Sequence, residues 1–415
     1  MDNCLINIKM AVISDLHVGG GSKAKDFSLD GESSGGVDNY IEQFSKFVER
    51  EGVAADYLLV PGDITNAGCK AEFELASLRI KEIAQILGVP EEKILFCPGN
   101  HDVDWVTIKA LKSIGHSDED VIKPKYLNMH ASSYIFNHNL SSANGRFDES
   151  PYLVTWEFAD AVVCALNTAA YDTPDKHPHC GEVKPGQLDE IDRLLAKISK
   201  TDKLKVFIFH HHPIQYLDVT FDQPDFSAMS NAAGLLDALA KHKFDFIVHG
   251  HKHIPRFNME IKSSGHPLNI LCAGSFSASL DNKYYEAVGN HFHIVEFHDR
   301  CNSSKYARGE VKTWTHYGGP GWMSSPGKST VDRQHNFGAF LPQAEVVSKL
   351  CALFEIAFGS ATHLKWKDFL LENPEFKYYT NEMLRSSLKD VSEALNVTLH
   401  EIDEFNLDQL IILKG

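Results

Sequence analysis

The stretch ILFCPGNHD, residues 94–102, decides how the rest of the chain is interpreted. Its first four residues are bulky and apolar, which is typical of a short buried β-strand. A proline and a glycine end such a strand, and Asn100, His101 and Asp102 follow directly. Functional sites of open α/β sheets lie at the carboxyl ends of their strands, so the stretch predicts a site at a sheet edge.

Other short apolar runs are followed in the same way by residues that can ligate metals. These segments are Asp15-Leu16-His17, Gly62-Asp63, His210-His211-His212-Pro213 and His249-Gly250-His251-Lys252-His253. An Asp-x-His or His-x-His pair that leaves a strand places two side chains on the same side, so one pair can bind an ion. A single Asp or Asn at a strand end is usually a helix cap or a turn residue. The combination with paired histidines favours metal ligation.

The periodicity of the chain from residue 8 to residue 300 is that of an α/β protein, because short β-branched runs alternate with amphipathic stretches. The pattern predicts strands at 8–14, 57–60, 94–97, 152–158, 161–166, 206–209, 244–248, 269–273 and 292–297. It predicts helices at 37–51, 71–87, 187–198, 232–242, 344–358 and 380–395.

The composition restricts the class of protein. With 415 residues and 43% hydrophobic residues, the chain can form two or three domains with sizeable cores. The 56 acidic residues outnumber the 40 basic ones, which argues against broad capture of nucleic acid by surface charge. An enzyme that acts on phosphate can still be acidic if metal ions bring positive charge into its site.

The cysteines and the apolar runs indicate the compartment. The eight cysteines are scattered without a Cys-x-x-Cys pair, as expected of reduced thiols in the cytoplasm. No apolar run reaches the length of about 18 residues that indicates a membrane helix, and the start of the chain does not resemble a signal peptide. We therefore expect a cytoplasmic protein without a membrane partner.

In their order along the chain, the motifs D-x-H, G-D, G-N-H-D, H-x-P and G-H-x-H resemble those of the calcineurin-like metallophosphoesterase superfamily. The resemblance covers about residues 8–300 and implies a four-layer α/β/β/α sandwich. It also implies that one metal ion is bound by Asp15, His17 and His253, that a second is bound by Asn100, His211 and His251, and that Asp63 bridges both. Within the triple histidine, His211 matches the H-x-P spacing, while His210 and His212 remain alternatives.

The resemblance further implies two divalent or trivalent metal ions, with Mn, Fe or Zn expected from the mixed oxygen and imidazole ligands. Two such ions about 3.5–4 Å apart can lower the pKa of a bridging water and generate a hydroxide nucleophile. His101 is the expected proton donor to the leaving group or stabiliser of the phosphoryl oxygens. Asp102 is expected to orient His101 or to support it from behind.

Two motifs narrow the expected reaction. Gly62 to Gly68 reads GDITNAG and Gly99 to Trp105 reads GNHDVDW, whereas protein serine/threonine phosphatases of the superfamily carry G-D-x-V-D-R-G and G-N-H-E. The form found here resembles the bacterial cyclic-nucleotide phosphodiesterase branch. We therefore expect hydrolysis of a small phosphodiester or nucleotide.

Two alternatives remain open. Residues 15–19 also match the D-x-H-x-G pattern of metal-dependent DNA or RNA nucleases in the superfamily, although the acidic charge and the lack of a basic arm argue against nucleic acid. A non-catalytic module that only reads a nucleotide is the other alternative.

We expect a catalytic domain at residues 1–315, a Gly/Ser/Pro-rich linker or loop at 316–340 and a small, mainly helical C-terminal region at 341–415. The apolar stripes of the last region predict packing on the catalytic domain, a homo-oligomer surface or a surface for a protein partner. The segment His177-Pro178-His179-Cys180 is interpreted as a loop near the substrate entrance, because it lacks a fourth zinc ligand at suitable spacing.

Overall fold

The computed structural model describes residues 4–31, 36–132, 145–146, 152–175, 179–198, 200–216, 228–280, 288–301, 304–324, 331–359, 361–401 and 407–415. The chain forms two compact units. The larger unit contains residues 8–294 and 314–324, and the smaller unit contains residues 1–7, 295–313 and 325–415. All the metal-ligating residues predicted from the sequence lie in the larger unit.

The first sheet has the strand order β13-β12-β11-β1-β2-β3, and one further strand pairs with β12. Its strands are β1 (Cys4–Val12), β2 (Tyr57–Pro61), β3 (Ile94–Cys97), β11 (Asn290–Arg300), β12 (Ala307–Tyr317), β13 (Gly321–Ser324) and β14 (Gln334–Phe337). Strands β1, β2 and β3 are parallel, and every residue of β2 and β3 is buried. Their carboxyl ends therefore meet at one edge.

The second sheet has the order β4-β5-β6-β7-β8-β10-β9. Its strands are β4 (Gly145–Arg146), β5 (Leu153–Glu157), β6 (Ala161–Leu166), β7 (Leu204–Ile208), β8 (Phe246–His249), β9 (Arg256–Ile261) and β10 (Pro267–Cys272). Strands β6, β7, β8 and β10 are parallel to one another. The aromatic rings of Phe96 and Trp156, one from each sheet, lie 6.4 Å apart.

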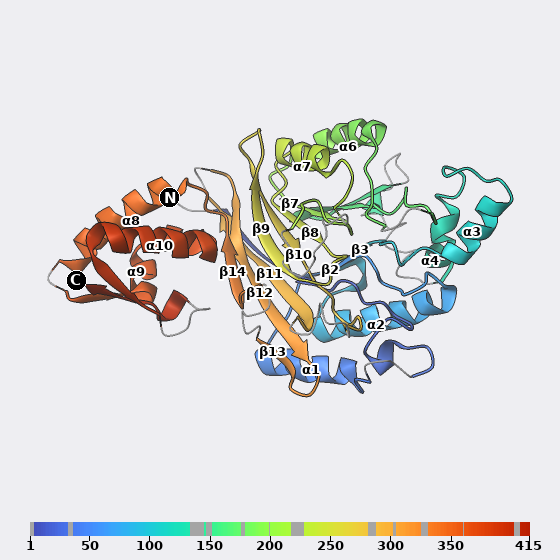
Figure 1. The fold of residues 1–415 in the computed structure, drawn as a ribbon, viewed down its shortest axis with the longest axis horizontal. Helices are drawn as coiled ribbons and strands as arrows, with labels where there is room; N and C mark the ends of the chain where they lie inside the picture. The colour runs from blue at the N-terminus through green and yellow to red at the C-terminus, as the bar shows by residue number, and fades with distance from the viewer. Residues whose placement is uncertain are drawn as a thin grey trace. The chain divides into compact units, whose positions relative to one another are not determined.

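Helices cover the outer faces of these two sheets. The helices of the larger unit are α1 (Tyr40–Glu51), α2 (Lys70–Leu87), α3 (Trp105–Ser113), α4 (Leu127–Ser132), α6 (Pro185–Ile198) and α7 (Ala232–Lys241). In Figure 1, α6 and α7 lie on one side of the paired sheets, while α1 and α2 lie on the other. Helix α1 buries Phe44, Phe47 and Val48, the face predicted by its helical spacing. The predicted α/β/β/α order of layers is confirmed.

The smaller unit has its own hydrophobic core, which includes Phe354, Trp366 and Ile412. Its helices are α8 (Gln343–Phe358), α9 (Trp366–Glu372) and α10 (Asn381–Leu395). Its three-stranded sheet has the order β15-β17-β16, from strands β15 (His363–Lys365), β16 (Val397–His400) and β17 (Ile411–Lys414). The region is thus helical with a small sheet, and its role in binding a partner stays a prediction.

Residues 316–324 and 331–340, the described part of the expected linker or loop, include strands, while residues 325–330 lie outside the described residues. Strand β12 runs to Tyr317, and β13 and β14 (Gln334–Phe337) each pair with it. Trp322 of β13 is only 3% exposed and packs against Phe44 and Phe47 of α1. The glycines and prolines of this stretch suggested a loop, but its buried aromatic residues give it a place in the sheet.

No helix of the described residues is long and apolar enough to span a membrane.

Candidate metal centre

The predicted ligands lie at the carboxyl ends of five strands from both sheets. Asp15 and His17 follow β1, Asp63 follows β2 and Asn100 follows β3. The triple histidine follows β7, and the segment 249–253 begins at the last residue of β8. The topology of two parallel strand sets thus brings distant segments of the chain together.

The backbone at these positions is unusual. Five of the predicted ligands have left-handed φ angles: Asp15 (50°), His17 (49°), Asp63 (49°), His251 (84°) and His253 (61°). A residue other than glycine in this region costs about 1–3 kcal/mol and persists only where the surrounding structure enforces it. Such strain clusters at functional sites, and here it aims the side chains at one another.

The first group consists of Asp15, His17 and His253. The Nε2 atom of His253 lies 3.3 Å from Oδ1 of Asp15 and 3.1 Å from Nε2 of His17. Asp15 is fully buried and accepts hydrogen bonds from the Ser14 hydroxyl and the His251 amide. These interactions fix the carboxylate while one of its oxygens faces the two imidazoles.

Asp63 lies between this first group and a second one. Its Oδ2 atom is 3.6 Å from Nε2 of His17 and 3.1 Å from Nε2 of His210, while its Oδ1 atom accepts a hydrogen bond from the His101 amide. Burial opposes its ionisation, yet the neighbouring imidazoles of His210 and His101 hold the pKa of Asp63 well below its ordinary value. The position is suitable for a bridging carboxylate.

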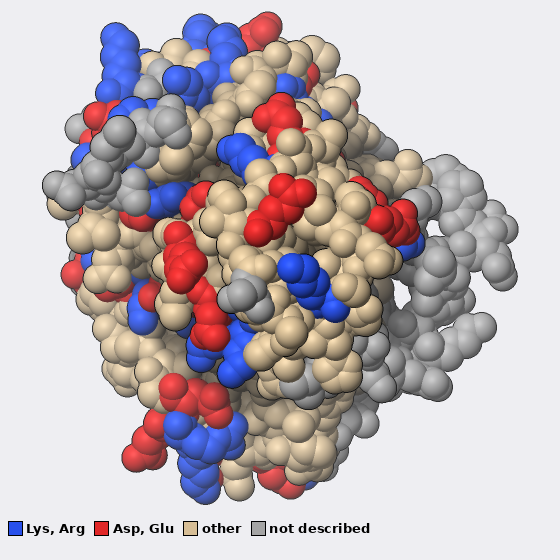
Figure 2. Space-filling view, turned by 90° about the vertical axis from the view of Figure 1, so that its left-hand side faces the viewer, with Lys and Arg blue, Asp and Glu red and all other residues tan. Residues whose placement is uncertain are grey.

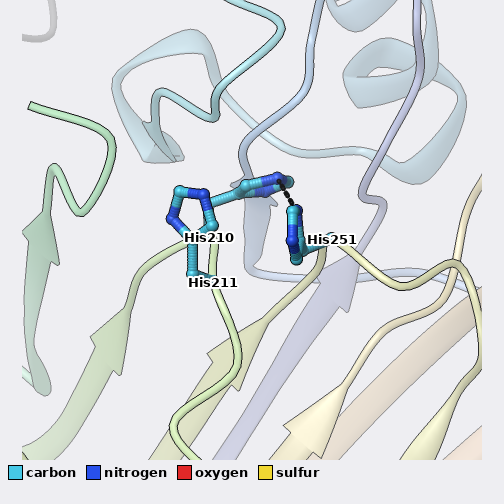
Figure 3. A group of neighbouring side chains, drawn as sticks. All are labelled: His210, His211 and His251. Atoms are coloured by element: carbon cyan, nitrogen blue, oxygen red, sulfur yellow. Dashed lines mark hydrogen bonds between the residues drawn. The ribbon is translucent and has the colours of Figure 1, made fainter. Parts of the chain in front are cut away.

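The second group consists of His210, His211 and His251 (Figure 3). The Nδ1 atom of His251 lies 3.3 Å from Nε2 of His210. His211 has its Nδ1 atom 2.8 Å from the Thr168 hydroxyl, while its Nε2 atom lies 3.5 Å from Oδ2 of Asp172 and makes no hydrogen bond within the described residues. Because Thr168 holds Nδ1, Nε2 is the atom of His211 that could bind a metal, and this role of His211 stays a prediction.

His210 is the residue that the sequence left undecided. Its Nδ1 atom lies 3.0 Å from the Pro61 carbonyl oxygen, which turns Nε2 toward Asp63. Burial alone would lower the pKa of His210, but the carboxylates of Asp63 and Asp15 raise it to about 9. The rings of His210, His211 and His212 all lie within 5.5 Å of that of His251, between centroids, but His212 also belongs to a different group with His249 and Cys272.

The donor set fits metal ions. Asn100 has a buried Oδ1 atom without a hydrogen-bond partner among the described residues, and the Nε2 atom of His211, 3.5 Å from Oδ2 of Asp172, makes no hydrogen bond there either. Burial, followed by the neighbouring histidines, lowers the pKa values of His17, His211 and His251 well below the ordinary value, so these rings are neutral. Neutral imidazoles of His17, His211 and His251 beside the carboxylates of Asp15 and Asp63 form a donor set that suits a cation.

The contacts of Asp102 do not match the first of its two expected roles, which was to orient the His101 ring. Its carboxylate accepts hydrogen bonds from the amides of Ile64, Thr65 and Gly99 and from the Thr65 hydroxyl, at 2.8–3.2 Å. The His101 ring instead places Nδ1 3.0 Å from the Asn66 carbonyl oxygen. Burial and then the charge of Asp63 raise the pKa of Asp102 to about 6. Asp102 thus connects the loops that carry Asp63 and Asn100.

The segment at residues 177–180 lies partly within the described residues. His179 stacks on Trp105 at 4.4 Å between ring centroids, and Trp105 donates a hydrogen bond to the Asn100 carbonyl oxygen. This contact places His179 beside a ligand-bearing loop, although the expected entrance loop also includes His177 and Pro178, which lie outside the described residues.

A substitution at Gly250 tests the first group, because the backbone of Gly250 packs directly against Asp15. A Cβ atom at Gly250 would collide with Oγ of Ser14 and Oδ2 of Asp15. We expect Gly250→Ala to displace Asp15 and to lower metal affinity by about 10–100-fold, the effect typical of a disturbed ligand shell. Metal titration monitored by calorimetry would measure the change.

Gly186→Ala is the matched control, since an added Cβ atom at this position of α6 meets nothing within 4 Å. Unchanged metal affinity in Gly250→Ala would contradict the role of this close packing.

The chain was compared with known families, sequences and solved structures. A family model described as calcineurin-like phosphoesterase matches residues 8–255. A search of curated protein sequences finds no match. Among solved structures, the chain is similar to a purple acid phosphatase from yellow lupin (Lupinus luteus), with 10% identity and a TM-score of 0.46 over 81% of this chain and 54% of that one.

Two further solved structures have comparably low sequence identities and TM-scores. A dimetal phosphatase from Danio rerio has 11% identity and a TM-score of 0.40 over 75% of this chain and 96% of that one. A 5′-nucleotidase precursor from Thermus thermophilus has 11% identity and a TM-score of 0.37 over 74% of this chain and 54% of that one. The chain spans about half the length of the lupin and Thermus proteins.

Proposed function

Because the chain belongs to the calcineurin-like phosphoesterase family, we propose that it is a dinuclear-metal phosphodiesterase that hydrolyses a cyclic nucleotide or a related small diester. The observation that carries this proposal is the position of the Asp63 carboxylate between two groups of side chains that can ligate metals, with Oδ2 3.6 Å from Nε2 of His17 and 3.1 Å from Nε2 of His210. The preference for a diester is supported by the motifs GDITNAG and GNHDVDW, which resemble those of cyclic-nucleotide phosphodiesterases.

The proposed ligands form two sets that share Asp63. Asp15, His17 and His253 would hold one ion, Asn100, His211 and His251 would hold the other, and Asp63 would contact both. Two such cations, when bound, supply an activated water and neutralise charge on the phosphoryl oxygens. The Nε2 atom of His210 lies close enough to Asp63 and His251 to replace or supplement His211.

His101 is the proposed proton donor to the leaving group. Its ring lies 4.6 Å from the ring of His17, between centroids, so it borders the metal centre. With Nδ1–H donating to the Asn66 carbonyl oxygen, the Nε2 atom of His101 is available to transfer a proton. A phosphodiester expels an alkoxide, which needs such a proton. Asp102 acts as a positioning residue, because it holds the loops of Asp63 and Asn100 together.

A nuclease is less well supported. The chain carries a net charge of −16, and in Figure 2 cationic and anionic side chains are interspersed on the face shown. A net negative charge of this size does not favour attraction of a nucleic-acid backbone.

The substrate preference can be tested with chromogenic esters. We expect purified protein with added Mn²⁺ to hydrolyse bis-p-nitrophenyl phosphate faster than p-nitrophenyl phosphate, because the two esters share the same leaving group and the motifs favour the diester. Release of p-nitrophenolate measures both rates. A preference for the monoester would replace the phosphodiesterase by a phosphatase, and cleavage of neither by metal-loaded protein would favour a nucleotide-reading module.

A further inference from the structure

A second cluster of metal-ligating side chains lies outside the set assigned to the dinuclear centre. It consists of His212, His249 and Cys272, which we call the His-His-Cys cluster. One ligand atom from each residue lies within 4.8 Å of the others, and all three residues have an exposed fraction of 0%. Two imidazoles and one thiol in a buried position need either hydrogen-bond partners or an ion.

The fold holds these three residues in fixed positions. His249 and Cys272 are the last residues of β8 and β10, and they lie directly opposite each other in the register of these parallel strands. The backbone of His212 is also held in place, because its carbonyl oxygen accepts a hydrogen bond from the Met229 amide. The cluster is therefore built by neighbouring strand ends and does not depend on a mobile loop.

The hydrogen bonds leave the donor atoms in states that suit a metal. His249 has Nδ1 3.2 Å from the Gly250 carbonyl oxygen, so Nδ1 carries the hydrogen and Nε2 carries a lone pair. The Tyr216 hydroxyl, 3.1 Å away, donates a hydrogen bond to that Nε2 atom, and a metal ion at Nε2 would replace this bond. The thiol of Cys272 donates weakly to the same Gly250 carbonyl oxygen, at 3.7 Å.

His212 is the strongest indication of a missing ligand. Both of its ring nitrogens are buried, and neither has a hydrogen-bond partner among the described residues. Its ring lies 5.3 Å from that of His249 and 5.4 Å from that of Tyr216, between centroids. A polar ring is rarely left in this state, since an unsatisfied buried nitrogen destabilises the fold.

We propose that the His-His-Cys cluster binds a third metal ion of the zinc type, with Tyr216 oxygen or a water in the fourth position. One thiolate and two imidazoles are a ligand set that zinc prefers in tetrahedral sites. On binding, the S–H bond of Cys272 breaks, its proton passes to solvent and a sulfur–metal bond forms. The site is buried and closed, so it is structural, and it anchors the ends of β8 and β10 beside the dinuclear centre.

Cobalt substitution tests the proposal on the whole protein. The ligands proposed for the dinuclear centre contain no thiol, so a thiolate-to-cobalt charge-transfer band would report on a different site. We expect this band in the Co²⁺-loaded wild-type protein, and we expect Cys272→Ser to lose it. Mass-spectrometric metal analysis should show one ion fewer per chain in the variant.

Cys164→Ser is the matched control, because Cys164 is equally buried but lies in β6 outside the cluster. It should keep both the band and the metal content. Absence of the band from cobalt-loaded wild-type protein would overturn the proposal even if Cys272→Ser failed to fold. Retention of the band and of all bound metal in Cys272→Ser would also overturn it.

Discussion

Asp63→Ala is expected to reduce phosphodiester hydrolysis by more than about 100-fold, since disturbing even residues that only support metal ligands costs about 10–100-fold. The expected cause is the loss of a carboxylate that lies between the two groups, at 3.6 Å from Nε2 of His17 and 3.1 Å from Nε2 of His210. Initial rates with bis-p-nitrophenyl phosphate at saturating Mn²⁺ would measure the loss, and metal analysis would show whether one ion or both are lost.

Asp63→Asn separates charge from shape, because the amide keeps the size of the side chain and removes its negative charge. Asp237→Ala, an exposed carboxylate on α7, is the control for the removal of any acidic residue. Activity of Asp63→Ala near that of Asp237→Ala would contradict a bridging role for Asp63 and, with it, the proposed dinuclear centre.

The strands that carry the site could be predicted because they are short, buried and uniformly apolar. Strands β2 and β3, at Tyr57–Pro61 and Ile94–Cys97, end where the proline and glycine signals place them. A buried parallel strand must be apolar on both faces, so its ends contrast sharply with the polar residues that follow. That contrast made the convergence of distant motifs predictable.

Other strands escaped prediction for a physical reason. Strand β12 reads ARGEVKTWTHY, and it is largely buried although it contains charged residues. Its burial depends on neighbouring strands that are remote in sequence, and a local pattern does not contain that information. The same holds for β9, which is only half-buried at the edge of its sheet.

Within the site, the sequence indicated residue types and positions but not hydrogen-bond partners. Asp102 follows His101 directly, which suggested that it orients that ring. Its carboxylate instead binds backbone amides of another loop, an interaction between residues 37 and 38 positions apart. Likewise, only the three-dimensional positions separate His210 and His211 from His212, because consecutive residues at a strand end point in different directions.

His101→Ala is expected to lower kcat by about 10²–10⁴-fold, the range typical of a lost general acid, while metal content stays unchanged. His101 borders the ring of His17 but is absent from both proposed sets of metal ligands. Steady-state kinetics together with metal analysis would measure the two quantities on the same preparation. Loss of metal in this variant would contradict the assigned role and make His101 a ligand.

A comparison of substrates with different leaving groups distinguishes the two roles expected of His101. A p-nitrophenolate leaves without protonation, whereas the alkoxide of a nucleotide ribose needs a proton as its bond to phosphorus breaks. The loss in His101→Ala should therefore be much smaller for bis-p-nitrophenyl phosphate than for a cyclic nucleotide. Equal losses for both substrates would indicate that His101 stabilises the phosphoryl oxygens, because such an interaction does not depend on the leaving group. The ratio of the two losses thus decides between the two roles open to His101.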